Sequence, residues 1–317
     1  MSARSRRPGR AVDASVQVGP LALPNPIIAA SGTFGHGDEV ARLCPPDALG
    51  AITVKSLAPY PWDGNPAPRL HPATAGMLNS VGLQGPGVTA WIEEDLPGLR
   101  AKGARVIASL WGRNVGDFAE AARLLAPAVG DLIAVEVNVS CPNLEDRSRI
   151  FAHSEEATRQ VVDAVASAGL GVPVLAKLSP NTDELPEIAA AAVEAGADAL
   201  TLVNTLLGYA IDIETRRPVL GAGRGGLSGA AIKPVALRAV HDVTRALPGV
   251  PVIGTGGVSN GRDAVEMLLA GASAVGVGTA TFRDPRAPQR ILGELLDWCA
   301  AHGVGRVRDL TGAVEDR

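Results

Sequence analysis

The chain has 317 residues, of which 46% are hydrophobic, so it can bury a large core. Its 29 basic and 33 acidic residues give a net charge of −4, which argues against binding to nucleic acid or to an anionic membrane surface. The three cysteines are far apart and include no C-x-x-C pair. This pattern argues against a disulfide framework, predicts no metal or iron–sulfur site, and is typical of a cytoplasmic protein.

The first residues carry a basic segment that we expect to be a flexible tail. Residues 1–15 contain four arginines, and no apolar stretch follows them that could serve as a signal peptide. Residues 16–23, with Gly19 and Pro20 at their centre, predict a small hairpin at the lower end of a barrel. We therefore expect residues 16–317 to form a single domain.

Short apolar stretches alternate with helical patterns along this domain. The predicted strands are residues 26–29, 51–54, 106–109, 132–138, 173–178, 199–203, 251–254 and 274–277. The predicted helices are residues 117–125, 154–168, 183–195, 231–247, 262–270 and 288–301. Eight apolar strands with intervening helices predict an α/β fold, a single (β/α)8 TIM barrel. Residues 58–97 and 205–229 are long insertions that we expect to lie over the carboxyl ends of the strands, where barrels bind substrates.

Polar side chains are concentrated where the predicted strands end. They are Ser31, Lys55, Ser56, Ser109, Asn138, Lys177, Asn204 and Thr205. A lysine at this end of a barrel strand cannot easily extend to the outer solvent, so it needs an anion or a hydrogen-bond acceptor inside the mouth. One such lysine could be structural, but two of them beside Asn138 and Asn204 favour a ligand site.

Cys141 follows the predicted strand at residues 132–138, and Pro142 follows it directly. The chain must turn there because proline cannot continue a hydrogen-bonded ladder. Cys141 is thereby placed at the carboxyl end of a buried strand, where parallel α/β proteins carry their chemistry. A cysteine there could simply pack as a small apolar side chain. The nearby Asn138, Ser140 and Asn143 favour a functional thiol instead.

Two glycine-rich turns follow the last two predicted strands. Gly256 and Gly257 lie in the first turn, shortly before a predicted helix, and Gly278 and Thr279 form the second. Glycines let backbone N–H groups approach an anion, and a helix N-terminus adds its dipole. One such turn could merely end a strand. Two turns at the usual phosphate site of barrels predict a phosphorylated ligand.

These motifs resemble those of class 1 dihydroorotate dehydrogenases, and most closely those of the class 1B catalytic subunit. The resemblance extends from residue 16 to about residue 310. It is carried by residues 25–35, 54–56, 64–69, 77–84, 138–143, 176–180, 203–205 and 225–229. Class 2 enzymes use a serine as their base, whereas this chain has Cys141 at that position.

The resemblance implies an FMN enzyme that oxidises (S)-dihydroorotate to orotate in the de novo synthesis of UMP. Cys141 would be the general base that takes the proton from C5, the hydride from C6 would pass to N5 of FMN, and Lys177 would stabilise negative charge on the flavin. The residues it assigns to FMN are Ser31, Lys55, Ser56, Ser109, Asn138, Lys177, Val203, Gly229, Gly256, Gly257, Gly278 and Thr279. The residues it assigns to the substrate are Lys55, Asn79, Ser80, Val81, Gly82, Leu83, Asn138, Asn143, Asn204 and Thr205. The family gives His36 no role, and we expect this loop histidine to be solvated.

The class 1B resemblance also implies a partner subunit. Electrons would pass to NAD through a subunit that carries FAD and a [2Fe-2S] cluster, in a heterotetramer built on a homodimer of this chain. Several alternatives stay open at this point. They are a class 1A enzyme that uses fumarate, another FMN barrel that acts on dihydropyrimidines, a Schiff-base aldolase with Lys177 as nucleophile, and a non-catalytic binding protein.

Overall fold

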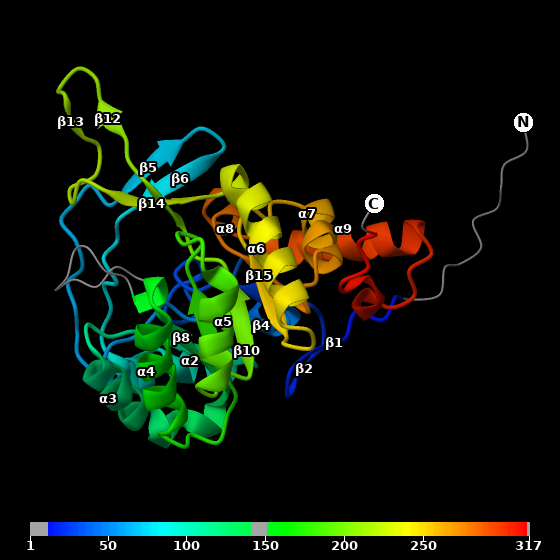
Figure 1. Ribbon diagram of the computed structural model, residues 1–317, viewed down its shortest axis with the longest axis horizontal. Helices are drawn as coiled ribbons and strands as arrows, with labels where there is room; N and C mark the ends of the chain where they lie inside the picture. The colour runs from blue at the N-terminus through cyan, green and yellow to red at the C-terminus, as the bar shows by residue number, and fades with distance from the viewer. Residues whose placement is uncertain (1–11, 141–150, 316–317) are drawn as a thin grey trace, which may run out of the picture.

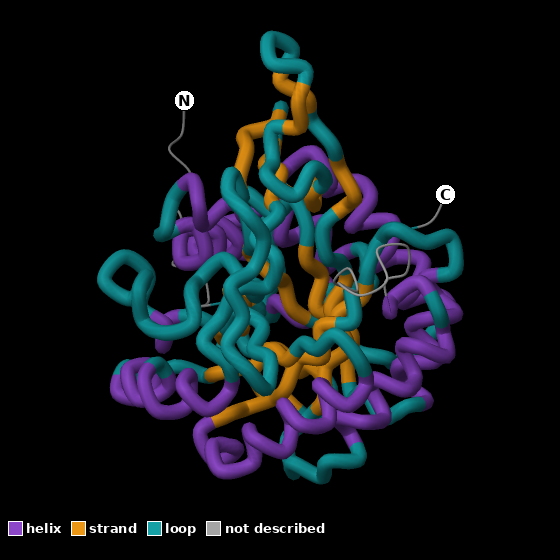
Figure 2. Tube along the Cα trace, turned by 90° about the vertical axis from the view of Figure 1, so that its left-hand side faces the viewer, coloured by secondary structure: helices purple, strands orange, loops and turns teal. Residues whose placement is uncertain are grey.

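The computed structural model describes residues 12–140 and 151–315. Within them, eight parallel strands close into a barrel, and helices surround it (Figure 1, Figure 2). In order around the barrel the strands are β3 (Ile27–Ala29), β4 (Ala51–Thr53), β7 (Val106–Leu110), β8 (Leu132–Asn138), β9 (Val174–Leu178), β10 (Ala199–Leu202), β15 (Val252–Thr255) and β16 (Ala274–Val277). Each strand pairs with the next in chain order, which confirms the predicted (β/α)8 barrel.

The barrel strands are buried along almost their whole length. Side chains of the barrel interior cover one face, and helices cover the other, so the strands read as continuous apolar runs. The α-helices are α1 (Val88–Glu94), α2 (Leu96–Ala101), α3 (Val115–Leu125), α4 (Glu155–Ala166), α5 (Leu185–Glu194), α6 (Lys233–Ala246), α7 (Gly261–Leu269), α8 (Ala280–Arg283) and α9 (Ala287–Ala301). Short 3-10 helices are Pro46–Ala48, Ala126–Asp131, Phe151–His153, Ala230–Ile232 and Val307–Leu310.

Helix α4 shows how the sequence specifies the outer layer. Its buried residues are Thr158, Val161, Val162 and Val165, whose spacing puts them on one helix face. This face packs against β8 and β9. The helix begins after Ser154, whose side chain caps the first turn. None of the helices in the described ranges combines the length and apolar character needed to span a membrane.

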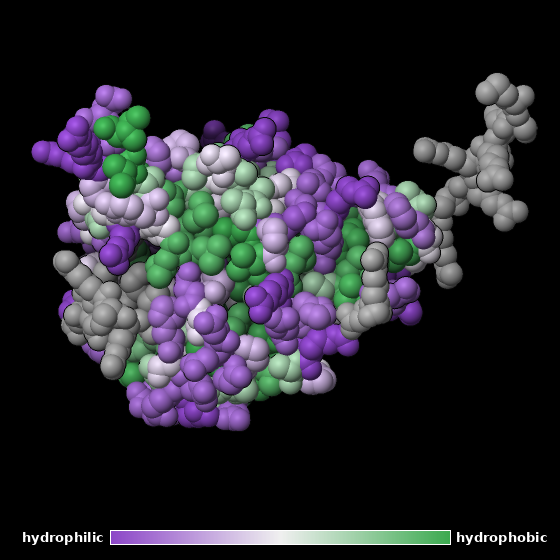
Figure 3. Space-filling view, turned by 45° about the horizontal axis from the view of Figure 1, so that its top comes forward, coloured by the Kyte–Doolittle hydropathy of each residue, from purple (hydrophilic) through white to green (hydrophobic). Residues whose placement is uncertain are grey.

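The two insertions meet in a small antiparallel sheet over the barrel mouth, which the sequence did not predict. Its strands, in order, are β11 (Leu206–Gly208), β14 (Gly225–Ser228), β6 (Gly76–Asn79) and β5 (Leu70–Ala73). A short hairpin of β12 (Ile211–Asp212) and β13 (Arg217–Pro218) projects beyond this sheet (Figure 1). Figure 3 shows an apolar group at this projecting corner, and Ile213 there is 81% exposed.

The predicted N-terminal hairpin is present as β1 (Val16–Val18) and β2 (Leu21–Leu23), which pair antiparallel. Its turn at Gly19 lies against Asp198 and Pro251, which directly precede β10 and β15. The hairpin therefore covers the amino-terminal end of the barrel, opposite the predicted site.

The last residues of the predicted tail, which was expected to span residues 1–15, make contacts in the structure. The Asp13 backbone N–H donates to Gly305 O at 3.0 Å, and the Val307 N–H donates to Asp13 O at 2.9 Å. Residues 12–15 therefore pack against the C-terminal part of the chain. The arginines of the predicted tail lie outside the described residues.

Candidate active site

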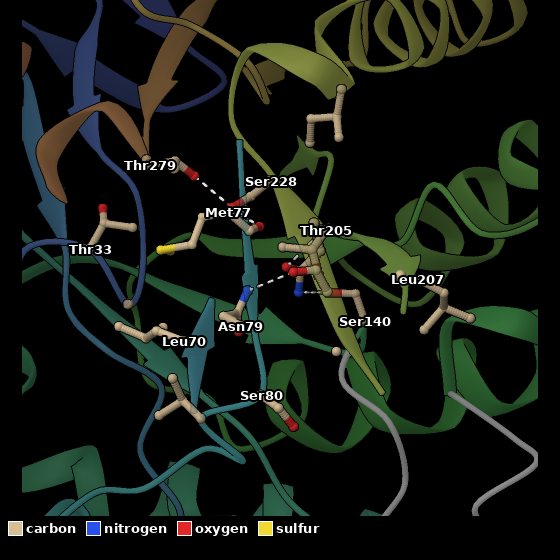
Figure 4. A pocket seen from close by; sticks show the side chains of 18 of the residues that line it. Thr33, Leu70, Met77, Asn79, Ser80, Ser140, Thr205, Leu207, Ser228 and Thr279 are labelled. Carbon is tan, nitrogen blue, oxygen red and sulfur yellow. Dashed lines mark hydrogen bonds between the residues drawn. The ribbon is translucent and has the colours of Figure 1, made fainter. Parts of the chain in front are cut away.

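A large cavity lies between the carboxyl ends of the barrel strands and the sheet formed by the insertions (Figure 4). Its volume is about 1570 Å³. Ligand pockets usually measure about 300–1,000 Å³, so this one has room for more than one small molecule. The predicted residues that line it are Ser31, Lys55, Ser56, Asn79, Ser80, Val81, Gly82, Leu83, Asn138, Lys177, Val203, Asn204, Thr205, Gly229, Gly256, Gly257, Gly278 and Thr279.

Among the described residues, one predicted site residue, Ser109, is not on this wall. Ser109 is fully buried and does not line the cavity, and its hydroxyl contacts Ser56 and Glu136. The predicted contact of Ser109 with a cofactor stays a prediction. Cys141 and Asn143 lie outside the described residues, although Ser140, directly before Cys141, lines the cavity.

Lys177 lies near the end of β9, opposite Asn138 of β8. Only 5% of Lys177 is exposed, and it lines the cavity. Its Nζ is 4.0 Å from Glu136 Oε1 and makes no hydrogen bond within the described part of the chain. A buried ammonium in this position is suited to an anionic or hydrogen-bond-accepting ligand, because it has been removed from water without gaining an acceptor.

Glu136 is a site residue that the sequence reasoning missed. It is 2% exposed, inside the barrel below the cavity. Ser109 Oγ donates to its Oε1 at 3.2 Å, and Thr201 Oγ1 donates to its Oε2 at 3.1 Å. The sequence could have indicated it, because Glu136 is a charged residue within an apolar strand. Such residues are rarely buried unless they are paired.

A chain of hydrogen bonds fixes the polar side chains around Lys177. Ser56 Oγ lies 2.9 Å from Ser109 Oγ, and Asn138 Nδ2 donates to Ser56 Oγ at 3.0 Å. Ser140 Oγ donates to Asn138 Oδ1 at 2.9 Å, and Asn204 Nδ2 donates to Ser140 Oγ at 2.6 Å. These bonds set the orientation of both amide groups, so the cavity presents donors and acceptors in fixed directions.

The insertions contribute the opposite wall of the cavity. Asn79 Nδ2 on β6 donates to Gly226 O on β14 at 3.2 Å, and Thr279 Oγ1 donates to Ser228 Oγ at 2.7 Å. Figure 4 shows the bond between Thr279 and Ser228, with Asn79 and Thr205 also on the cavity wall. The second bond connects the turn after β16 to the sheet of the insertions.

The two glycine-rich turns have the properties of a phosphate cradle. Gly256 and Gly257 have φ of +130° and +77°, and a Cβ on Gly257 would lie 2.7 Å from Lys233 N at the start of α6. A side chain there would therefore be strained and would clash with the helix. Close by, Thr255 Oγ1 is buried and has no partner among the described residues. Backbone amides and a helix start beside these turns suit an anionic group such as a phosphate.

His36 is half-buried, not solvated as expected. Its Nε2 is buried and has no hydrogen-bond partner within the described residues. Burial and the nearby Lys55 ammonium lower the pKa of His36 below its ordinary value. Both effects favour the neutral form of the histidine.

Comparison with known proteins identifies the family. The family model described as dihydroorotate dehydrogenase matches residues 14–298. The chain belongs to the dihydroorotate dehydrogenase family. Its relatives include the "Dihydroorotate dehydrogenase B (NAD(+)), catalytic subunit" of Geobacter sulfurreducens, which is 45% identical over 96% of this chain and 98% of the relative. The protein of the same name from Alkaliphilus oremlandii is 44% identical over 94% of this chain and 97% of the relative.

The predicted resemblance to dihydroorotate dehydrogenases, with the class 1B catalytic subunits among them, is confirmed. A "Putative dihydroorotate dehydrogenase A (fumarate)" from Solibacter usitatus is 48% identical over 93% of this chain and 96% of the relative. Membership of this family identifies the chain as an oxidoreductase. It overturns the aldolase and binding-protein alternatives.

Proposed function

We propose that this dihydroorotate dehydrogenase oxidises (S)-dihydroorotate to orotate with FMN, in the de novo synthesis of UMP. The observation that carries the proposal is the buried Lys177 ammonium, which lines the cavity beside oriented amides and has no hydrogen-bond partner within the described residues. An electron-rich planar ligand would supply the missing acceptor. The family of the chain and the two glycine-rich turns support FMN as one such ligand.

The residues that would hold FMN come from both ends of the cavity. Gly256, Gly257, Gly278 and Thr279 would bind its phosphate through their backbone N–H groups. The remaining assigned residues that line the cavity are Ser31, Lys55, Ser56, Asn138, Lys177, Val203 and Gly229. FMN, when bound, would supply an acceptor for the hydride that leaves C6 of the substrate.

The substrate fits the amide groups that line the cavity. Dihydroorotate and orotate have two amide-like edges and a carboxylate. Asn79, Asn138 and Asn204 can offer both donors and an acceptor to such edges, and Lys55 can offer a cation to the carboxylate. Further assigned contacts are Ser80, Val81, Gly82, Leu83, Asn143 and Thr205.

Cys141 is the proposed general base. It would accept the proton from C5 as a thiolate, a role typically worth about 10²–10⁴ in rate. Ser140, the residue directly before Cys141 in the sequence, lines the cavity and is held between Asn138 and Asn204. Nearby lysine charge would favour the thiolate over the thiol.

We infer that electrons leave toward NAD through a second subunit that carries FAD and a [2Fe-2S] cluster. Relatives named as type B catalytic subunits support this acceptor. A heterotetramer built on a homodimer of this chain is the assembly we expect, and the sparse cysteines favour the cytoplasm. The relative named as a type A enzyme makes fumarate the second candidate for the electron acceptor.

The purified chain itself provides the test. Heat should release FMN, to be identified by chromatography, and anaerobic dihydroorotate should bleach the bound flavin. Recovery of FAD, or a flavin that dihydroorotate does not reduce, would overturn the proposal. Flavin reduction by other dihydropyrimidines, assayed in parallel, would indicate instead the alternative of another FMN barrel that acts on dihydropyrimidines.

A second assay distinguishes the electron acceptors. The isolated chain should reduce an artificial dye with dihydroorotate, but should reduce NAD barely. NAD reduction should appear when the FAD and iron–sulfur subunit is co-purified. Efficient fumarate reduction, or strong NAD reduction by the chain alone, would contradict the type B assignment and leave the FMN assignment standing.

A further inference from the structure

A carboxylate lies in the barrel interior directly below the cavity. Barrel interiors are normally filled with branched apolar side chains. Here Glu136 on β8 is 2% exposed and lies at the same level as Ser109 on β7. Burying a carboxylate is costly unless the charge is paired and hydrogen-bonded, so its presence requires a compensating arrangement.

Both oxygens of Glu136 are held by neutral donors. Ser109 Oγ donates to Oε1 at 3.2 Å, and Thr201 Oγ1 donates to Oε2 at 3.1 Å. These two hydrogen bonds hold the carboxylate in place. Its Oε1 lies 4.0 Å from Lys177 Nζ, beyond hydrogen-bond distance. Glu136 therefore supplies a negative charge close to Lys177 without occupying the donors of its ammonium.

We propose that Glu136 is a positioning residue that balances the charge of Lys177 and thereby holds down the reduction potential of the bound flavin. This inference rests on the proposed FMN site. A hydride that arrives without a proton adds negative charge to the flavin ring. A lone Lys177 cation would favour that charged state, whereas the Glu136–Lys177 pair has no net charge and favours it less.

The balance matters because electrons must leave as well as enter. A flavin that is reduced too readily would take the hydride quickly and pass its electrons on slowly. The hydroxyls of Ser109 and Thr201 keep the carboxylate at its distance, which preserves the donors of Lys177 for the flavin.

The direct test is anaerobic redox titration of the FMN-loaded protein and of Glu136→Gln. The amide has the shape of the carboxylate but lacks its charge. We expect the equilibrium to shift about tenfold toward reduced flavin, which corresponds to about 30 mV for a two-electron couple. Sulfite, which adds to electron-poor flavins, should also bind more tightly to the variant.

Glu120→Gln is the matched control, because Glu120 on α3 is an exposed partner of Arg123 and loses the same charge. Its flavin potential should equal that of the wild type. An unchanged or lower potential in Glu136→Gln would overturn the proposal. If Glu136→Gln does not fold alone, the same comparison is made between Lys177→Gln and the Glu136→Gln/Lys177→Gln double variant, where neutralising Glu136 must again raise the potential.

These outcomes separate the two proposals. A wild-type chain that holds no FMN would refute the proposed function itself. A wild-type chain that holds FMN, with the same potential in Glu136→Gln, would refute only the role of Glu136.

Discussion

Asn204 Nδ2 donates a hydrogen bond to Ser140 Oγ at 2.6 Å, across 64 residues of sequence. The bond connects the end of β10 to the end of β8, two strands separated in the barrel by β9. Lys177 lies on that middle strand. The ends of β8 and β10 are therefore joined into one polar wall on either side of Lys177, and Cys141 directly follows Ser140 of this wall in the sequence.

Because Asn204 is part of this polar wall, we expect its loss to weaken orotate binding. Asn204→Ala should weaken orotate binding by about 1–3 kcal/mol, because it leaves a polar edge of the ring unpaired and releases Ser140. Asn138→Ala should have a similar effect. Titration of the flavin spectrum with orotate measures both. Ser167→Ala, an exposed change at the end of α4, is the control. Wild-type affinity in both asparagine variants would contradict the assigned role.

Gly278 allows a separate test of the phosphate cradle. A Cβ there would lie 3.8 Å from both Ala30 Cβ and Thr33 Cγ2, so Gly278→Ala should fold without strain. All three residues line the cavity, and the methyl group would occupy space near the proposed phosphate. We expect FMN affinity to fall by roughly tenfold, or about 1.4 kcal/mol.

Fluorescence titration of the apoprotein with FMN measures this change. Gly130→Ala adds the same methyl group where nothing lies within 4 Å, and it should bind FMN as the wild type does. Equal affinity in Gly278→Ala and Gly130→Ala would show that the turn after β16 does not contact the phosphate.

The barrel was predictable because its strands carry continuous apolar runs and its helices carry one apolar face. The predicted barrel strands end within one residue of those observed, and the predicted helices within two. The sheet of the insertions was not predictable in this way. Its strand β5 alternates between exposed and half-buried residues, β14 begins with two glycines, and the sheet forms by pairing between distant segments such as Asn79 and Gly226.

The location of the site was predictable from polar residues at the strand ends. Which of these side chains line the cavity and which lie beneath it was not predictable. Ser109 and Ser56 both follow apolar runs, yet Ser56 lines the cavity and Ser109 lies beneath it. Which level a side chain occupies depends on the stagger between strands, and a single sequence does not show that stagger. Glu136 could have been found from its charge within an apolar strand, although its ion pair with Lys177 depends on the pairing of β8 and β9.

His36 predicts an acid sensitivity of folding. The pKa of His36 is lowered in the folded state by burial and by Lys55. Above about pH 6.5 the ring is neutral in both the folded and unfolded states. As the pH falls through that value, the unfolded chain binds the proton more readily, so the stability of the folded state decreases.

Thermal unfolding on either side of this pH measures the effect. His36→Gln should lose less stability in acid than the wild type, because the titrating group is gone. Ser167→Ala, an exposed change at the end of α4 that removes no titratable group, should retain the wild-type pH dependence. A wild-type pH dependence in His36→Gln would show that another group causes the acid sensitivity.

Reduction of FMN by dihydroorotate in this chain should depend on Cys141 as the base. The decisive measurement is anaerobic stopped-flow flavin reduction in the wild type, Cys141→Ala and Cys141→Ser. Cys141→Ala should keep its FMN and lose about 10²–10⁴ in the reduction rate at neutral pH. Cys141→Ser should be slow and recover in part at high pH, because a serine is harder to deprotonate. Reduction at the wild-type rate in both variants would contradict the claim.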